Sequence, residues 1–145
     1  MNWRTDAITA HRKDDARRRN LQFEDLYNQA RAAGLAAGGV HTPTPMFVGT
    51  AKDLISDEID RSQPIYRVES GVCGFAWVNI KPGTSAFAKW LKTMGHARAD
   101  SYYGGVTIWV SEYNQSMERK ECHADAMARV LQGGGIKAQS MSRMD

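Results

Sequence analysis

The sequence predicts an α+β fold, with a four- or five-stranded mixed sheet packed against two to three helices. Three segments place apolar residues at helical spacing, and several others are short, apolar and rich in β-branched and aromatic residues. Glycine and proline pairs separate these segments. The predicted order along the chain is α-β-β-α-β-α-β, and we expect right-handed crossovers wherever a helix joins two parallel strands.

The first predicted helix begins at Asn20, which is a suitable N-cap, and ends at Gly38-Gly39. Phe23, Leu26, Tyr27 and the alanines that follow recur on one of its faces. Residues 1–19 are polar and mixed in charge. We therefore predict a charged N-terminal arm over residues 1–19, mobile or forming a frayed helix start, and a single α+β domain over residues 20–145.

The segment that follows the first helix is irregular. Residues 41–45 contain two prolines and predict a stiff extended connection to a short strand at Met46-Phe47-Val48. Residues 49–63 are acidic and polar, and predict a long loop with at most one helical turn. A strand is expected from Pro64 to Ser70, with Gly71 as a tight corner after it.

The remaining elements form the predicted body. A short helix capped by Thr84 or Ser85 should bury a face made of Phe87, Trp90, Leu91 and Met94. The other expected elements are strands over residues 72–80, 106–113 and 136–144 and a long helix over residues 117–132.

Positive charge is concentrated at the start of the chain. Residues 1–20 contain six Lys or Arg and three Asp, a net charge of +3, whereas the remaining residues contain thirteen of each sign. Binding to phosphates requires positive charge gathered on the binding surface. This distribution argues against nucleic acid as a partner of the body and leaves residues 1–20 as the segment that could bind it.

The chain contains no apolar run long enough to cross a membrane and no apolar leader at its N-terminus, so we expect no membrane association. Cys73 and Cys122 have no metal-ligand spacing and are expected to be reduced thiols in a cytoplasm. The four histidines are scattered, and Asp53, Asp57, Glu58 and Asp60 cluster only in a predicted loop. We expect no metal and no cofactor, and in the absence of a catalytic motif we rank an enzyme last among the functions.

Two tryptophans lie on strand faces where a simple half-buried sheet would be polar. Trp77 alternates with Phe75 and Asn79, and Trp109 alternates with Thr107, Ser111 and Tyr113. Aromatic rings beside hydrogen-bonding groups either stack on a flat ligand or pack under the first helix or a second subunit. Tyr103, which precedes Gly104-Gly105, is a further candidate, because that turn permits close approach of a ligand.

The junction before the long helix is a second candidate site. Asn114 and Gln115 lie where a helix N-terminus presents free N–H groups, and Arg119 and Lys120 lie in its first turn. Cations there oppose the helix dipole, which favours a bound anion. The alternative is ordinary capping by Asn114 or Ser116, with Glu118 as the favourable charge. Arg143 on the last strand could also hold an anion. Glu121 falls within the apolar stripe of the helix and needs either a partner or solvent.

Four segments resemble a group of small phage-encoded hypothetical proteins: Gly71 to Val78, Gly104 to Val110, Asn114 to Glu121, and the ending Ser142-Arg143-Met144-Asp145. The likeness covers roughly residues 20–145. It implies a phage accessory protein in the cytoplasm of an infected bacterium, and brings no activity, cofactor or site with it.

The leading functional hypothesis is a homo-oligomeric binding protein that holds a small anionic ligand, most plausibly a nucleotide. By analogy, it would sequester a host nucleotide signal and so counter a defence. The alternatives are a protein–protein interaction module that acts on a host or virion protein, and a single-stranded nucleic-acid binder. The predicted ligand-binding residues are Trp77, Asn79, Tyr103, Trp109, Tyr113, Asn114, Gln115, Arg119, Lys120 and Arg143.

Overall fold

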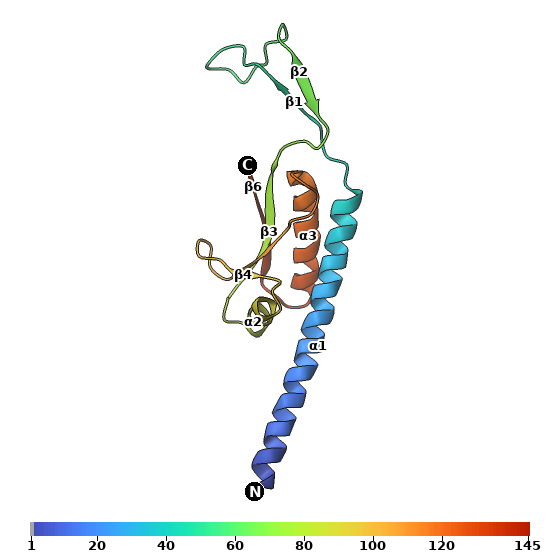
Figure 1. Ribbon diagram of the computed structural model, residues 1–145, viewed down its shortest axis with the longest axis vertical. Coiled ribbons are helices and arrows are strands. Elements are labelled where there is room, and N and C mark those ends of the chain that lie inside the picture. Colours follow the sequence, from blue (N-terminus) through green and yellow to red (C-terminus); the bar gives the residue numbers. More distant parts are fainter. Residues whose placement is uncertain (1) are drawn as a thin grey trace.

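The computed structural model describes residues 2–145, and this part of the chain folds into three helices and six strands (Figure 1). The α+β class predicted from the sequence is confirmed. The helices are α1 (Trp3–Val40), α2 (Ala86–Thr93) and α3 (Met117–Gly133), and the strands are β1 (Met46–Gly49), β2 (Ile65–Val68), β3 (Gly74–Ile80), β4 (Arg98–Ala99), β5 (Val106–Trp109) and β6 (Ala138–Met144).

The main sheet has four strands in the order β4-β5-β3-β6, and every pairing is antiparallel. The strand directions therefore differ from those of the mixed sheet that we expected. β5 and β6 do run in the same direction, as the crossover through α3 requires, but β3 lies between them. The chain also turns back after α2 through β4, so that β5 meets β3 antiparallel. The segment from β3 to β6 is a split β-α-β-β-α-β arrangement of the ferredoxin-like kind.

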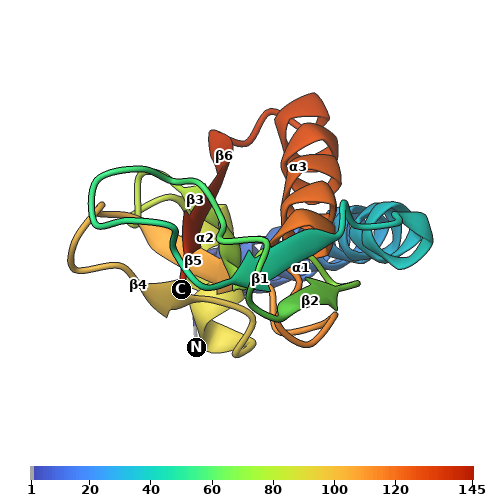
Figure 2. The same ribbon diagram turned by 90° about the horizontal axis from the view of Figure 1, so that it is seen from above.

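The helices cover one face of this sheet. Ala76, Val78 and Ile80 alternate along β3 and are fully buried, because they face the apolar side of α3. α2 closes the same core, with Ser85 accepting a hydrogen bond from the amide of Ala88 as the predicted N-cap. The opposite face of the sheet carries no helix (Figure 2).

α1 packs on α3 and α2 rather than on the sheet. Its buried residues Ala30, Gly34 and Gly38 are small, which lets the backbone of α1 approach α3 closely. Nearer its N-terminus, Phe23 and Tyr27 pack their rings against Trp90 of α2. The first helix therefore covers the helical side of the molecule and leaves the aromatic sheet face uncovered.

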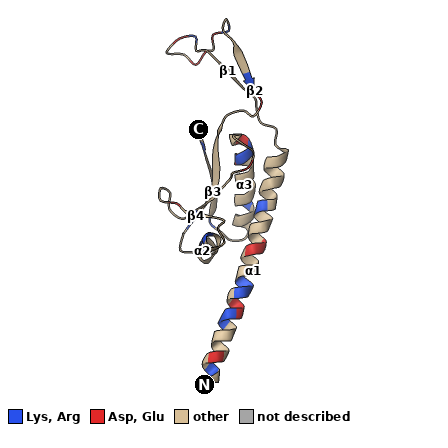
Figure 3. Ribbon diagram, viewed as in Figure 1, with Lys and Arg blue, Asp and Glu red and all other residues tan. Residues whose placement is uncertain are grey.

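The predicted start of the first helix at Asn20 is wrong, because α1 begins at Trp3. Residues 3–19 contain no glycine or proline, and His11 and Arg18 both pair with Asp15 at helical spacing. They extend from the body as a largely exposed helix that carries much of the positive charge (Figure 3). Local preference continues the helix here although the segment has no apolar stripe.

β1 and β2 form a separate two-stranded hairpin that projects from the opposite end of the molecule (Figure 1). The strand expected over residues 64–70 thus pairs with β1 and does not join the main sheet. Residues 50–64 connect the two strands without a helical turn. The corner at Gly71 is present, with a φ of 71°.

Candidate functional site

Trp77 and Trp109 lie side by side on the uncovered face of the sheet. They are directly opposite each other on β3 and β5, and their rings stack with centroids 5.6 Å apart and an interplanar angle of 10°. Trp77 is only 5% exposed, whereas Trp109 is 48% exposed. Trp109 therefore presents a ring surface to solvent, and the stacked ring of Trp77 supports it.

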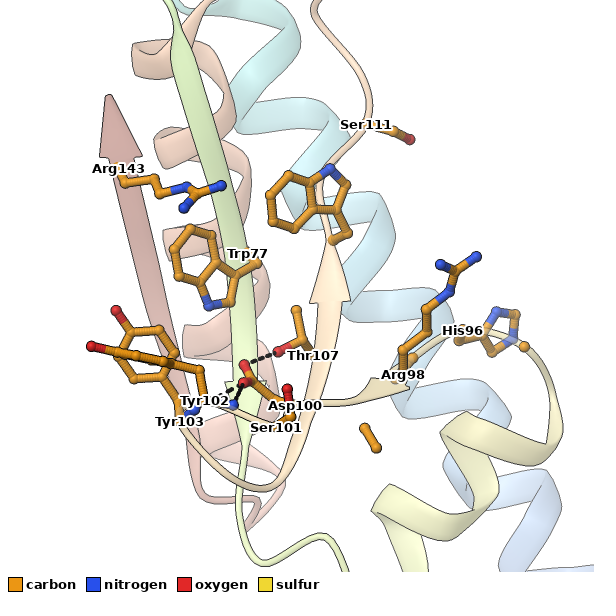
Figure 4. Close-up of a pocket in the computed structure, with 14 residues that line it drawn as sticks. Trp77, His96, Arg98, Asp100, Ser101, Tyr102, Tyr103, Thr107, Ser111 and Arg143 are labelled. Atoms are coloured by element: carbon orange, nitrogen blue, oxygen red, sulfur yellow. Dashed lines mark hydrogen bonds between the residues drawn. The ribbon is translucent and has the colours of Figure 1, made fainter. Parts of the chain in front are cut away.

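Further aromatic rings surround this pair. The ring centroid of Phe75 is 5.5 Å from that of Trp109, and the centroid of Tyr103 is 6.1 Å from that of Trp77. Together with β4 and the loop after it, the two tryptophans and Tyr103 border a hollow of about 1050 Å³ on the sheet surface (Figure 4). A planar ligand fits such a surface because it can stack on Trp109 while its edges reach polar groups.

The indole N–H of Trp77 is buried and finds no acceptor among residues 2–145. An unmade hydrogen bond at a buried donor costs about 1–3 kcal/mol, so most such groups are paired. The ring nitrogen points along the hollow toward the end where Asp100 and Tyr103 lie (Figure 4). It is a donor that a ligand acceptor could satisfy.

Two arginines border the hollow at different edges of the sheet. Arg98 comes from β4 and Arg143 from β6, and neither forms an ion pair within the described chain. The guanidinium of Arg143 lies 5.3 Å from the ring centroid of Phe75. Both cations therefore retain their donors for an anionic group.

Asp100 is the acidic residue of the hollow, and its oxygens are already engaged. It accepts hydrogen bonds from the amides of Tyr103 at 2.8 Å and Tyr102 at 2.9 Å and from the hydroxyl of Thr107 at 2.8 Å. These bonds, above all the one from the Tyr103 amide, hold the pKa of Asp100 below its ordinary value. Asp100 shapes the tyrosine loop as a carboxylate rather than serving as a free base.

Asn79 also holds the tyrosine loop in place, from the other side of the loop. Its side-chain amide is buried and donates to the carbonyl of Gly104 at 2.9 Å. Gly104 and Gly105 both have positive φ, 78° and 68°, which glycine adopts without strain. Asn79 therefore fixes the loop that carries Tyr103, and its amide is not free for a ligand.

The other predicted site residues lie around the junction before α3. Tyr113 turns toward α1, where its hydroxyl lies 2.8 Å from Nδ1 of His123 and 3.3 Å from the carbonyl of Gly34. Burial raises the pKa of Tyr113 and lowers the pKa of His123. Tyr113 and Asn114 adopt positive φ values of 68° and 53°, in the turn that leads into α3.

The cations of this junction are used in packing. Arg119 donates to the carbonyls of Gly38 at 2.9 Å and Gly39 at 3.3 Å, at the C-terminus of α1, where a positive charge is favourable. Lys120 is buried and donates to the carbonyl of Gly74 at 3.3 Å. The structure thus brings Arg119 and Lys120 to backbone carbonyls and not into the hollow.

Glu118 occupies the space beside the N-terminus of α3. Its carboxylate bonds to His41 at 3.0 Å and accepts from the amide of Thr44 at 2.8 Å. The bond from His41, followed by that from Thr44, lowers the pKa of Glu118. Asn114 and Gln115 are exposed nearby, and Glu121 is half-buried without an ion pair within residues 2–145. Glu118 supplies the negative charge of the capping alternative, but the side-chain cap is not formed, because the N-cap residue Ser116 makes no capping hydrogen bond.

Of the ten predicted ligand-binding residues, the structure brings four to the hollow: Trp77, Tyr103, Trp109 and Arg143. Sequence reasoning missed Arg98, Asp100 and Tyr102, which also border it. Asp100 had a local signal, since an Asp that opens a loop ending in Gly104-Gly105 favours an Asx turn. Arg98 had none, because it lies on a two-residue edge strand within a segment that reads as a loop.

The described residues contain no group of three or more His, Cys, Asp or Glu side chains positioned to hold a metal ion. Cys73 and Cys122 are free thiols, and burial raises the pKa of Cys122. None of the helices in the described part of the chain is long and apolar enough to span a membrane.

No protein-family model matches this chain, and no similar protein was found among curated proteins or solved structures. The resemblance to small phage proteins therefore stays a prediction from the sequence.

Proposed function

We propose that the uncovered face of the sheet binds a nucleotide, with its base stacked on Trp109. The observation that carries this proposal is the half-exposed ring of Trp109, held in place by the parallel ring of Trp77 on the neighbouring strand. A preformed, supported ring loses little conformational entropy when a base stacks on it. Stacking on such a ring contributes about 1–3 kcal/mol per base.

The groups around Trp109 suit the remaining parts of a nucleotide. Arg98 and Arg143 supply planar guanidinium donors, which bind phosphate oxygens bidentately. The unpaired indole N–H of Trp77 can donate to an acceptor on the base or the sugar. Asp100 excludes a second negative group from its end of the hollow, so the phosphate lies toward one of the arginines.

The biological setting of such binding rests on the sequence alone. Sequestration of a nucleotide signal in an infected bacterium and docking on a host or virion protein both stay predictions, as does a homo-oligomeric state. Binding at the hollow requires none of them.

The four indole N–H groups give a direct test. In a ¹⁵N-labelled sample titrated with AMP or UMP, we expect the indole signals of Trp77 and Trp109 to shift. Trp90, buried between α1 and α2, and Trp3, exposed on the helical extension, are internal controls whose signals should stay in place. Ribose 5-phosphate, which has no base, should leave all four signals unchanged.

Substitutions then assign the stacking to one ring. Trp109→Ala should weaken AMP binding by about 5- to 150-fold, the equivalent of about 1–3 kcal/mol, whereas Trp109→Phe should retain most of it. Trp3→Ala is the matched control on an exposed tryptophan. If AMP and UMP shift no indole signal at millimolar concentration, or if Trp109→Ala binds as the parent does, the proposal is wrong.

A further inference from the structure

We propose that the ligand of the uncovered face is a single strand of nucleic acid that crosses the sheet diagonally between Arg143 and Arg98. This inference rests on the proposed nucleotide binding at Trp109 and extends it. The groups that could contact a ligand are spread over the whole width of the sheet, so that one mononucleotide would leave several of them unused.

The two arginines lie on opposite edge strands. Arg143 on β6 is paired with Phe75 on β3, and Arg98 on β4 is paired with Thr107 on β5. β4 and β6 are three strand spacings apart, about 14 Å, and the register places the two arginines about four residues apart along the strands, about 13 Å. The backbones of the two arginines are therefore about 19 Å apart along the diagonal, so a strand with several phosphates would serve both cations, whereas a mononucleotide has its phosphate at one place only.

Aromatic rings are available at two separate places on the uncovered face, one on this diagonal and one to the side of it. Trp109 presents its ring near the centre of the sheet, and Tyr102 and Tyr103, which are 85% and 42% exposed, lie on the loop at one end of the hollow. Figure 4 shows Tyr102 and Tyr103 on one side of Trp77, with Arg143 and Arg98 on different sides of that ring. Two aromatic places suit two bases.

The topology agrees with this use. In a four-stranded sheet of the same β-α-β-β-α-β order, aromatic residues on the two central strands stack the bases of single-stranded RNA. Here the central strands are β3 and β5, and they carry Trp77 and Trp109 on the face without helices. The likeness is one of arrangement, and the contacts around Trp109 carry the inference.

Because residues 21–145 carry no net charge, stacking should provide most of the affinity and phosphates a limited part. Binding to a single strand depends on salt with a slope of about −0.7 per phosphate contacted, so two contacts give a slope near −1.4. The basic residues of the helical extension, residues 3–19, would instead give steeper binding that does not depend on Trp109.

Fluorescence anisotropy with labelled oligouridylates of two, four and eight units tests the proposal, with UMP, pUpU and a cyclic dinucleotide as unlabelled competitors. We expect the eight-unit strand to bind at least tenfold more tightly than the dinucleotides, with a salt slope near −1.4. If a dinucleotide competes as well as the octanucleotide, the proposal of a bound single strand is wrong, whereas the proposal of a nucleotide site stands. If neither strands nor nucleotides bind, both proposals fail.

Variants locate the strand on the molecule. Arg98→Gln and Arg143→Gln should each weaken octanucleotide binding several-fold and make the slope shallower by about 0.7. Arg129→Gln, on the exposed side of α3, is the matched control and should change neither value. If replacing Arg17, Arg18 and Arg19 by Gln abolishes binding while Trp109→Ala leaves it intact, the strand binds the helical extension and the proposal is overturned. Circular dichroism of each variant verifies folding.

Discussion

The ring of Tyr113 packs against the backbone of α1 at Gly38. A Cβ atom placed on Gly38 would lie 2.5 Å from Cζ and 2.6 Å from the hydroxyl oxygen of that ring. At Gly39, the next residue of the same helix, a Cβ atom would meet no atom within 4 Å. The two neighbouring glycines thus differ in packing alone.

We therefore predict opposite effects of two alanine substitutions. Gly38→Ala should lower the free energy of unfolding by about 1–3 kcal/mol, because the Tyr113 ring and its bond to His123 must move. Gly39→Ala should leave stability unchanged or raise it by up to about 1 kcal/mol, because alanine favours the helix. Urea denaturation measures both values. Equal effects at the two positions would contradict the close approach of α1 to Tyr113.

Trp77, Trp109 and Arg119 show how much of the candidate site the sequence alone predicts. Strand alternation placed Trp77 and Trp109 on one face correctly, because that pattern is local. It could not show that Arg119 would be drawn to the carbonyls at the end of α1, since this contact joins residues about 80 positions apart. Cations in the first turn of α3 predicted a bound anion. In the structure, Arg119 instead contacts the negative C-terminal end of α1.

Among the elements, the N-terminal part of α1 is the one that folds without tertiary packing. Residues 3–19 are exposed except for the half-buried Ala16, so no periodic apolar signal marked them as a helix. Their helical state follows from composition and from pairs such as Asp15 with Arg18. Methods that look for a buried stripe therefore place the helix start at Asn20, where packing on the body begins.

Removal of residues 2–19 should accordingly leave the body intact. We expect the melting temperature to change by only a few degrees, because few buried contacts are lost, and the far-ultraviolet helical signal to fall. A longer deletion, through residue 27, is the control: it also removes Phe23 and Tyr27 from Trp90 and should lower the melting temperature strongly. A large loss of stability from the shorter deletion would show that the extension packs on the body.

The strands illustrate the limit at the level of elements. Alternation fixed which side of β3 and β5 is buried, and it gave five of the six strands to within a few residues. Alternation carried no information on strand direction. Placing β3 between β5 and β6 makes every pairing antiparallel, but it leaves the local pattern of each strand unchanged. The pairing of β2 with β1 was equally hidden, since β1 has three apolar residues and a glycine and β2 is mostly apolar, so that either sequence fits either sheet.

The whole molecule is elongated, because its two least packed segments project from opposite ends. The helical extension lies at one end and the β1–β2 hairpin at the other, with the body between them (Figure 1). The hairpin pairs only with itself within the described chain and exposes Phe47, Tyr66, Leu54 and Ile55. A two-stranded hairpin of this kind is marginally stable alone, so it should exchange its amide hydrogens faster than the body.

Small-angle X-ray scattering tests this shape. A compact chain of 145 residues has a radius of gyration of about 15 Å. We expect a clearly larger value for the full chain. For a chain of residues 20–145 in which a short Gly-Ser linker replaces residues 46–68, we expect a value close to the compact one for its own length, about 13 Å. Light scattering on the same samples must give equal subunit numbers, because an oligomer would also enlarge the radius. A full-length monomer near 15 Å would mean that the extension folds back onto the body.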